Sequence, residues 1–249
     1  MASTRCYLDF AAGDQCKYDQ ELSAYRGLEK WLAQNGPKYG LTTELSELSE
    51  TDRETLAAMY EGEAKVVLTP LSFAPPPSLR LPRLYFSVSG SQGLRKTREN
   101  FVDLLTDSKQ LKSKRSPNPP LRYVGSKVFR IEEGFVAQTG DVTRQDGSGG
   151  ESIYGGAFND EKEGLKTTFE LGTIAMANSG KNSNTSQFFV TLTSDPAKLK
   201  KLASKYVAFG QADLSVASSR ECLDVLSTLG NGQGGTKVPV WIEECNVCE

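Results

Sequence analysis

The sequence predicts a mostly β protein, folded as a closed antiparallel barrel with a small number of helices. Many short segments carry branched or aromatic residues in a roughly period-two order, which is typical of strands. Turn-forming residues separate these segments at short intervals, and this arrangement favours a barrel. Apolar residues at helical spacing are confined to a few stretches, so helices are expected to be the minor element.

The first part of the chain contains one predicted strand and two predicted helices. Residues 5–11 alternate like a strand, whereas residues 18–34 carry apolar side chains at spacings of three and four, which predicts a helix. Thr51 and Glu54 form a capping box for a second helix, which we expect to end at Gly62. Two further segments follow: a possible strand at residues 64–68 and a linker at 72–82 that holds four prolines.

The rest of the chain is predicted to be rich in strands. Phe101, Leu104 and Leu105 mark one face of a helix over residues 97–106. Ser218 and Glu221 are expected to cap a later helix, and a short helix is possible within residues 196–204. The basic segment 108–122 is expected to be an exposed, solvated loop. Strands are predicted at residues 83–88, twice within 124–142, and at 171–176, 187–192, 206–210 and 237–244.

Composition excludes several classes of function. The chain has 249 residues and a net charge of −2, which gives no reason to expect a nucleic-acid or membrane partner. No apolar run or leader-like N-terminus is present, so we expect a cytoplasmic protein, and we expect it to be a monomer. Histidine is absent, which removes the usual general base and most zinc sites. The five cysteines are expected to be free thiols, and no metal or cofactor is expected.

A polar loop between two predicted strands is the first candidate for a binding surface. Residues 176–190, MANSGKNSNTSQFFV, combine small polar residues with a glutamine and two phenylalanines at the exit. Phe188 and Phe189 must point to opposite faces of their strand, so we expect Phe188 in the core and Phe189 at the binding surface. The Gly-rich residues 147–150 are not a phosphate loop, because the required Lys and Ser or Thr are missing.

Three segments occur in an informative order: FRIEEGFVAQTGDVTRQDGSGGESIYGGAFNDE, GTIAMANSGKNSNTSQFFVTL and KYVAFG. Together they resemble the cyclophilin family of peptidyl-prolyl cis-trans isomerases, and the resemblance covers residues 83–249. It implies an eight-stranded antiparallel barrel with a helix closing each end. It also implies an enzyme that isomerises X–Pro bonds in peptides or proteins during folding or remodelling.

The resemblance changes the interpretation of the N-terminal part. RCYLDFAAGD, at residues 5–14, resembles the first strand of the family, whereas residues 83–101 resemble its second strand and first helix. We therefore expect a single domain over 1–249, in which 1–14 supply strand one. Residues 15–79 would be a helical insertion in the first hairpin, and 80–249 would form the rest of the barrel. The alternative is an independent N-terminal helical domain.

The resemblance also assigns roles to individual residues. Arg130 is expected to stabilise the twisted amide, and its alternative role is a surface ion pair with Glu132 or Glu133. Lys201 stands at the usual Trp position, which implies possible but weakened cyclosporin binding, although Leu199 could fill that position instead. The expected substrate-binding residues are the proline-pocket side chains Phe135, Val136, Phe189 and Leu202, the polar Gln138 and Gln187, the backbone strip Ala177 and Asn178, and Tyr206, which replaces a common His.

Two other functions compete with the enzyme. The barrel could be a scaffold that binds proline-containing segments with weak or no isomerase activity, and the extra helical segment favours this alternative. Retention of Arg130, Phe135, Gln138 and Phe189 together favours the enzyme. A barrel that carries a small apolar ligand inside is disfavoured, because the family's barrel interior is filled with side chains.

Overall fold

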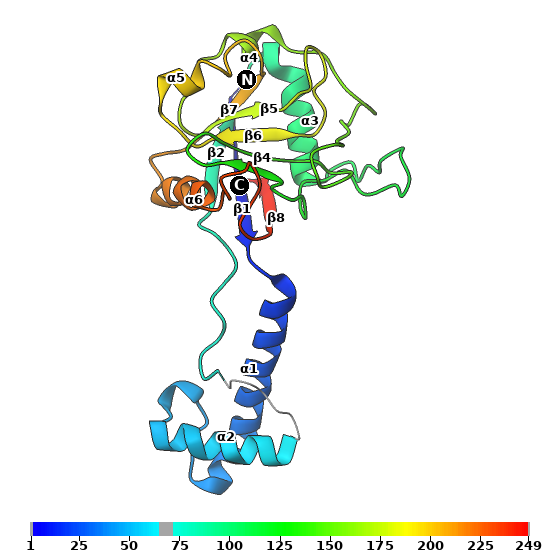
Figure 1. Cartoon of the computed structure of the whole chain (residues 1–249). Coiled ribbons are helices and arrows are strands. Elements are labelled where there is room, and N and C mark those ends of the chain that lie inside the picture. The colour runs from blue at the N-terminus through cyan, green and yellow to red at the C-terminus, as the bar shows by residue number, and fades with distance from the viewer. Residues whose placement is uncertain (1, 65–71, 249) are drawn as a thin grey trace. The chain divides into compact units, whose positions relative to one another are not determined.

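The computed structural model describes residues 2–64 and 72–248, which form two compact units (Figure 1). One unit, here called the barrel unit, contains the chain up to Ala12 together with the chain from Arg80 onward. The other, the 13–79 unit, spans Gly13–Leu79. The connection between two neighbouring strands of the barrel unit is therefore itself a compact unit with its own helices.

The barrel unit is built on an eight-stranded antiparallel sheet in the order β3-β4-β6-β5-β7-β2-β1-β8. Backbone hydrogen bonds from Gly125 and Val128, just before β3, reach Ile242 and Val240 in β8, so the two ends of the strand order are joined. The predicted mostly β, eight-stranded antiparallel fold is confirmed. The strands are β1 (Thr4–Ala12), β2 (Leu84–Val88), β3 (Arg130–Glu132), β4 (Val136–Thr139), β5 (Thr173–Met176), β6 (Phe188–Thr191), β7 (Ala208–Ala212) and β8 (Val240–Val247).

An aromatic cluster anchors helix α3 (Arg95–Thr106) to the sheet. The ring of Phe101 lies 5.1 Å from that of Phe188 and 4.7 Å from that of Phe209, measured between centroids. Each such pair contributes about 0.5–1.5 kcal/mol beyond simple burial of area. Phe188 is buried in this main core whereas Phe189 belongs to a separate apolar cluster, as strand alternation predicted.

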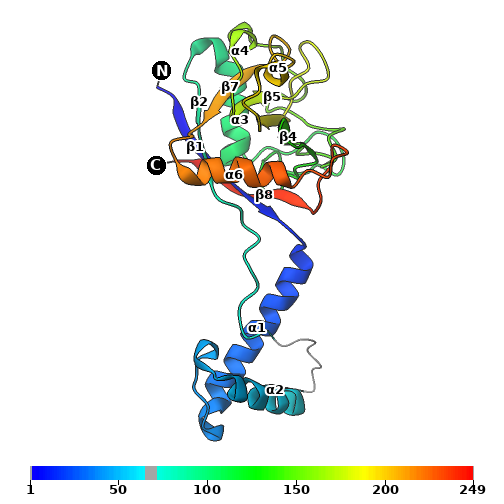
Figure 2. The same ribbon diagram turned by 60° about the vertical axis from the view of Figure 1, so that its left-hand side comes forward.

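Helix α6 (Ala217–Thr228) packs against the core from another side (Figure 2). Its buried residues include Cys222, Leu223 and Leu226, as predicted. The predicted cap by Ser218 and Glu221 is wrong, because Val216 occupies the N-cap and no side chain caps the helix. Ser218 instead donates a hydrogen bond to the Arg83 carbonyl at 2.8 Å, so tertiary pairing with the start of β2 replaces the local cap. Two shorter helices, α4 (Lys162–Lys166) and α5 (Pro196–Leu199), complete the barrel unit.

The 13–79 unit contains helices α1 (Gln15–Asn35) and α2 (Glu50–Ala64) around its own small core. Helix α1 begins three residues earlier than predicted, because the Asp14 side chain accepts a hydrogen bond from the Lys17 amide at 3.0 Å. The predicted capping box at Thr51 is also wrong. Ser49 and Asp52 exchange the reciprocal backbone hydrogen bonds, so α2 begins earlier, and it extends past Gly62. Apart from Ala64, the predicted strand at 64–68 lies outside the described residues.

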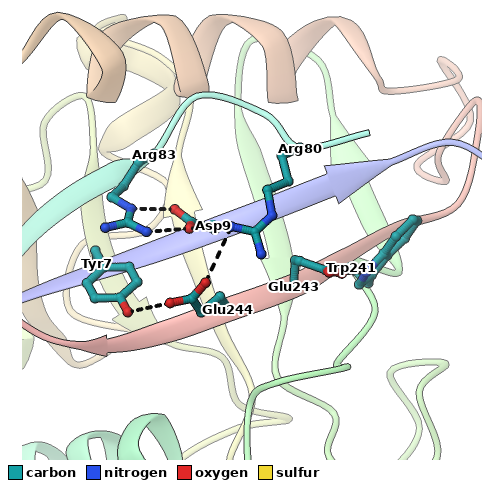
Figure 3. Close-up of polar contacts among 7 residues, drawn as sticks. All are labelled: Tyr7, Asp9, Arg80, Arg83, Trp241, Glu243 and Glu244. Carbon is teal, nitrogen blue, oxygen red and sulfur yellow. Dashed lines mark hydrogen bonds and ion pairs between the residues drawn. The ribbon is translucent and has the colours of Figure 1, made fainter. Parts of the chain in front are cut away.

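A polar cluster joins β1, β8 and the segment that leads into β2, close to the point where the chain leaves for the 13–79 unit (Figure 3). The buried Asp9 carboxylate accepts two hydrogen bonds from the Arg83 guanidinium, at 2.7 and 2.6 Å. The same guanidinium lies 3.9 Å above the centre of the Tyr7 ring, and the Tyr7 hydroxyl donates to Glu244 at 2.8 Å. Arg80 lies 3.3 Å from the Glu244 carboxylate. These charge-assisted contacts tie the three strands together at this position.

Candidate functional site

One hollow on the barrel unit gathers nearly all of the predicted site residues. It has a volume of about 360 Å³ and takes side chains from β3, β4, β6 and the segments that follow β5 and α5. Gln187 is the one predicted residue that does not line it. The lining residues are Arg130, Phe135, Val136, Gln138, Ala177, Asn178, Phe189, Lys201, Leu202 and Tyr206. We call this hollow the proline pocket, after the role proposed below.

Strand alternation explains why these side chains meet. Val136 and Gln138 are two residues apart on β4 and share a face, whereas Ala137 between them points into the main core. In the antiparallel register, Gln138 pairs with Arg130 on β3 and with Phe189 on β6. The guanidinium, the amide and the phenyl ring therefore occupy adjacent positions across three strands.

The apolar part of the pocket has its own packed support. Val136, Phe189 and Leu202 are buried, and they belong to one cluster with Phe135 and Tyr206 packed against it. The Phe189 and Tyr206 rings meet edge to face, with centroids 5.2 Å apart. Because these side chains are held by packing, the pocket presents a fixed apolar surface of a size that suits a small ring.

A chain of hydrogen bonds fixes the polar part of the pocket. Arg130 donates to the Gln138 side-chain oxygen at 3.4 Å, and the Gln138 amide donates to the Gln187 oxygen at 2.9 Å. Gln187 in turn donates to the carbonyls of Gly147 and Gly149, at 2.9 and 2.7 Å. Gln187 therefore lies behind Gln138 and orients it.

Asp141, which the sequence did not single out, organises the loop that receives Gln187. Its buried carboxylate accepts hydrogen bonds from the amides of Thr143, Arg144, Gly147 and Gly149, at 2.9–3.1 Å. Burial raises the pKa of this carboxyl, but the amide hydrogen bonds outweigh burial and lower the pKa below its ordinary value. The sequence feature that could have indicated this role is the position of Asp141 at the start of a Gly-rich segment. An aspartate there is typical of a side chain that accepts hydrogen bonds from loop amides.

The guanidinium of Arg130 also forms an ion pair with the Glu132 carboxylate, two residues along β3. This contact is the alternative role expected for Arg130, and it coexists with the position of Arg130 at the proline pocket. Glu133 is exposed and forms no ion pair with Arg130 among the described residues. The arginine therefore meets both Gln138 and a competing anion.

Lys201 and Leu199, the two candidates for one position of the family pocket, lie in different places. Lys201 lines the pocket, whereas Leu199 is buried in the apolar cluster beside it. The Asn178 side chain donates to the Lys205 carbonyl at 3.0 Å, which links the strip after β5 to the segment before β7. The rim therefore carries a cationic side chain at Lys201.

Three further observations concern metal ligands, cysteines and membrane helices in the described residues. Over 2–64 and 72–248, no three acidic or cysteine side chains gather in a way that could hold a metal ion. The five cysteines are all free. No helix in the described ranges has the length and apolar character needed to cross a bilayer.

The chain matches the model of a known protein family. The family model described as cyclophilin type peptidyl-prolyl cis-trans isomerase/CLD matches residues 92–247, which is more than half of the chain. The match includes every residue that lines the proline pocket. The eight-stranded antiparallel sheet is the architecture expected of that family. The chain therefore belongs to the cyclophilin-type peptidyl-prolyl cis-trans isomerase family.

Proposed function

We propose that this protein is a peptidyl-prolyl cis-trans isomerase that acts on X–Pro bonds in peptides or proteins, with Arg130 stabilising the twisted amide. One observation carries the proposal. Arg130, Gln138, Phe189 and Leu202 converge on a single pocket that offers a cationic donor beside an apolar slot. These are the two features that the reaction requires of a protein.

Rotation about an X–Pro bond is slow because the nitrogen lone pair is delocalised into the carbonyl. The barrier is about 18–20 kcal/mol, and the uncatalysed process takes on the order of tens to hundreds of seconds. Twisting the bond localises the lone pair on nitrogen, which then becomes a hydrogen-bond acceptor. A donor that meets this nitrogen only in the twisted state lowers the barrier without any nucleophile or proton transfer.

Arg130 supplies such a donor. A guanidinium stays charged at all relevant pH values and presents its N–H groups in one plane. The Gln138 oxygen accepts one of these N–H groups, and Gln187 holds Gln138 through its amide. The donor is thus oriented before substrate arrives, which is the condition for effective electrostatic catalysis.

The remaining pocket residues would hold the proline while the other side of the bond turns. Phe135, Val136, Phe189 and Leu202 would contact the ring. The strip at Ala177 and Asn178 would align the peptide backbone beside it. Fixing the ring and the backbone separately leaves the X–Pro bond as the part that rotates.

A second candidate function is a proline-binding scaffold with weak isomerase activity. The ion pair between Arg130 and Glu132 favours it, because an engaged guanidinium is a poorer donor to the amide nitrogen. Such a scaffold would use the same apolar pocket to hold proline, but it would not depend on the arginine for affinity.

The Arg130→Ala variant distinguishes the two functions. A protease-coupled assay on a short X–Pro peptide should show kcat/KM reduced by about 10²- to 10³-fold, the usual loss for one transition-state donor. Arg122→Ala is the matched control, because Arg122 is an exposed arginine outside the pocket. A rate within twofold of wild type for Arg130→Ala would refute the proposed mechanism. If the wild-type protein binds the X–Pro peptide but does not accelerate its isomerisation, the scaffold function is favoured.

A further inference from the structure

A second hollow adjoins the proline pocket. It has a volume of about 930 Å³ and lies between α4, the loop after β5 and the segment before β7. It shares Asn178 and Tyr206 with the proline pocket, so the two hollows adjoin at these residues. Figures 1 and 2 show α4 and α5 at the same end of the curled sheet. A peptide seated on the Asn178 strip would extend into this second hollow.

Lysines dominate the charge of this second hollow. Lys162, Lys181 and Lys205 line it, and Lys201 lies at the adjoining rim of the proline pocket. Each is exposed, and within the described residues none of the four ammonium groups lies in ion-pair contact with a carboxylate. We call Lys162, Lys181 and Lys205, the three that line the second hollow, the lysine rim.

The carboxylates that adjoin Lys162 in the sequence accept hydrogen bonds from other groups. Asp160, the acidic residue that lines the second hollow, accepts hydrogen bonds from the Asn182 amide and the Asn184 side chain, both at 2.8 Å. Glu161 accepts the amides of the first turn of α3, and Glu163 accepts the Ser91 hydroxyl at 2.6 Å. These contacts fix the carboxylates in loop and helix caps. The second hollow therefore has three lysines against the single carboxylate of Asp160, which leaves an excess of positive charge for a ligand.

The β3 side of the proline pocket carries charges of both signs: the Glu132 carboxylate pairs with Arg130, and the Lys198 ammonium donates to the Gly134 carbonyl at 2.8 Å, next to Glu133. Glu132 lies beside Arg130 on β3, and Glu133 is exposed on the turn that follows. A substrate segment that crosses the pocket would therefore meet an excess of lysines on one side of the proline and a near balance of charge on the other. Opposite charges at complementary positions favour one orientation and raise the rate of encounter.

We propose that the lysine rim recognises an acidic side chain of the substrate, located a few residues to one side of the isomerised proline. The inference rests on the proposed isomerase function and names its substrate class: X–Pro segments flanked on one side by Asp or Glu. Lys162, Lys181 and Lys205 select this class, while the proline pocket carries out the isomerisation.

The test is a peptide series with one X–Pro bond and a single Glu or Gln placed two to four residues before or after the proline. For wild type, the ratio of kcat/KM between Glu and Gln peptides should reach roughly five- to tenfold at low ionic strength, as expected for two or three exposed ion pairs. The gain should occur on one side of the proline only. In about 0.5 M NaCl the ratio should fall below about twofold, because exposed charges are then screened over a few ångströms.

The variant Lys162→Gln/Lys181→Gln/Lys205→Gln should bring the Glu-to-Gln ratio close to one. A wild-type ratio near one at every position, or a ratio that the variant retains, would overturn the proposal. The salt dependence of the wild-type protein tests the same electrostatic origin without any substitution, and a ratio unchanged by salt would also overturn it. If the proposed isomerase function fails, neither the Glu nor the Gln peptides will isomerise faster than the uncatalysed rate. That outcome differs from catalysis of both peptides with a Glu-to-Gln ratio near one.

A matched control comes from the exposed basic residues elsewhere in the barrel unit. The variant Lys112→Gln/Lys114→Gln/Lys127→Gln changes the net charge by the same amount but leaves both hollows untouched. It should keep the Glu-to-Gln ratio of wild type. An equal loss of the ratio in this control would show that overall charge attracts acidic peptides, and the lysine rim would then carry no specificity.

Discussion

Replacing Glu132 by Gln should increase isomerase activity. The Glu132 carboxylate forms an ion pair with the guanidinium that would serve the amide nitrogen. The Arg130 and Glu132 side chains are 47% and 37% exposed, so the pair belongs to the class of solvent-screened surface interactions. Such pairs contribute about 0.2–1 kcal/mol. Releasing Arg130 from this competitor should therefore raise kcat/KM between about 1.4- and 5-fold.

The assay is the protease-coupled measurement on a neutral X–Pro peptide, at low and at high ionic strength. Glu133→Gln is the matched control, because it removes the same charge from the neighbouring exposed position. High salt weakens the ion pair in wild type, so the advantage of Glu132→Gln should shrink as salt increases. The control should show neither the gain nor this dependence.

Two results would refute this reasoning. If Glu132→Gln lowers kcat/KM, the carboxylate orients Arg130 for the reaction and does not compete with substrate. If both substitutions raise the rate equally, the effect comes from the general potential around the pocket, and the contact between Glu132 and Arg130 is irrelevant.

Four further predictions concern binding and stability. Lys201→Trp should strengthen cyclosporin binding by roughly 5- to 30-fold in a calorimetric titration, because an aromatic ring adds buried contact area at the rim; unchanged affinity would contradict this role. Asp9→Asn should lower the free energy of unfolding in urea by about 1.5–3 kcal/mol, since its charge-assisted hydrogen bonds weaken; a smaller loss would mean that the cluster is dispensable. The lowered pKa of Asp141 means that its ionised form stabilises the fold. The loss of unfolding free energy caused by Asp141→Asn should therefore be largest above about pH 5 and should shrink as the pH falls below 3.8. A difference in unfolding free energy that does not depend on pH would exclude this cause. Deleting residues 1–14 should abolish the cooperative thermal transition of the barrel unit, and a normal melt would contradict the role of β1.

Patterns that depend on strand geometry could be predicted from the sequence. Alternation alone assigned Phe188 to the main core and Phe189 to the other face, and the structure confirms both. The same period explains why Val136 and Gln138 face the pocket together. The resemblance, by contrast, gave Arg130 and Gln138 as residues of one site, and only the structure shows that they lie opposite each other, because cross-strand register cannot be derived from composition or spacing.

Features that depend on tertiary contacts were beyond the sequence. Ser218 has the local signature of a helix cap, yet its hydroxyl bonds to the strand that α6 packs against. Asp141 gathers loop amides from residues up to eight positions away, which no fixed motif encodes. Lys162 and Lys205 are 43 positions apart, so only the fold could reveal that they face one hollow. In each case a side chain finds a distant partner whose position follows from the sheet, not from local propensity.

The position of β1 bears directly on the domain organisation. β1 is an interior strand, paired with β2 through Leu8 and Leu84 and with β8 through Leu8 and Cys245. A strand with neighbours on both sides cannot leave the sheet without exposing two edges of unpaired backbone groups. The 13–79 unit has its own buried core, so its stability need not come from the barrel unit. We therefore propose that it is an insertion in the first hairpin. Among its described residues, 13–64 and 72–79, none lines the proline pocket or the hollow beside it, so changes at these positions should leave the proposed catalysis and charge selection unaltered.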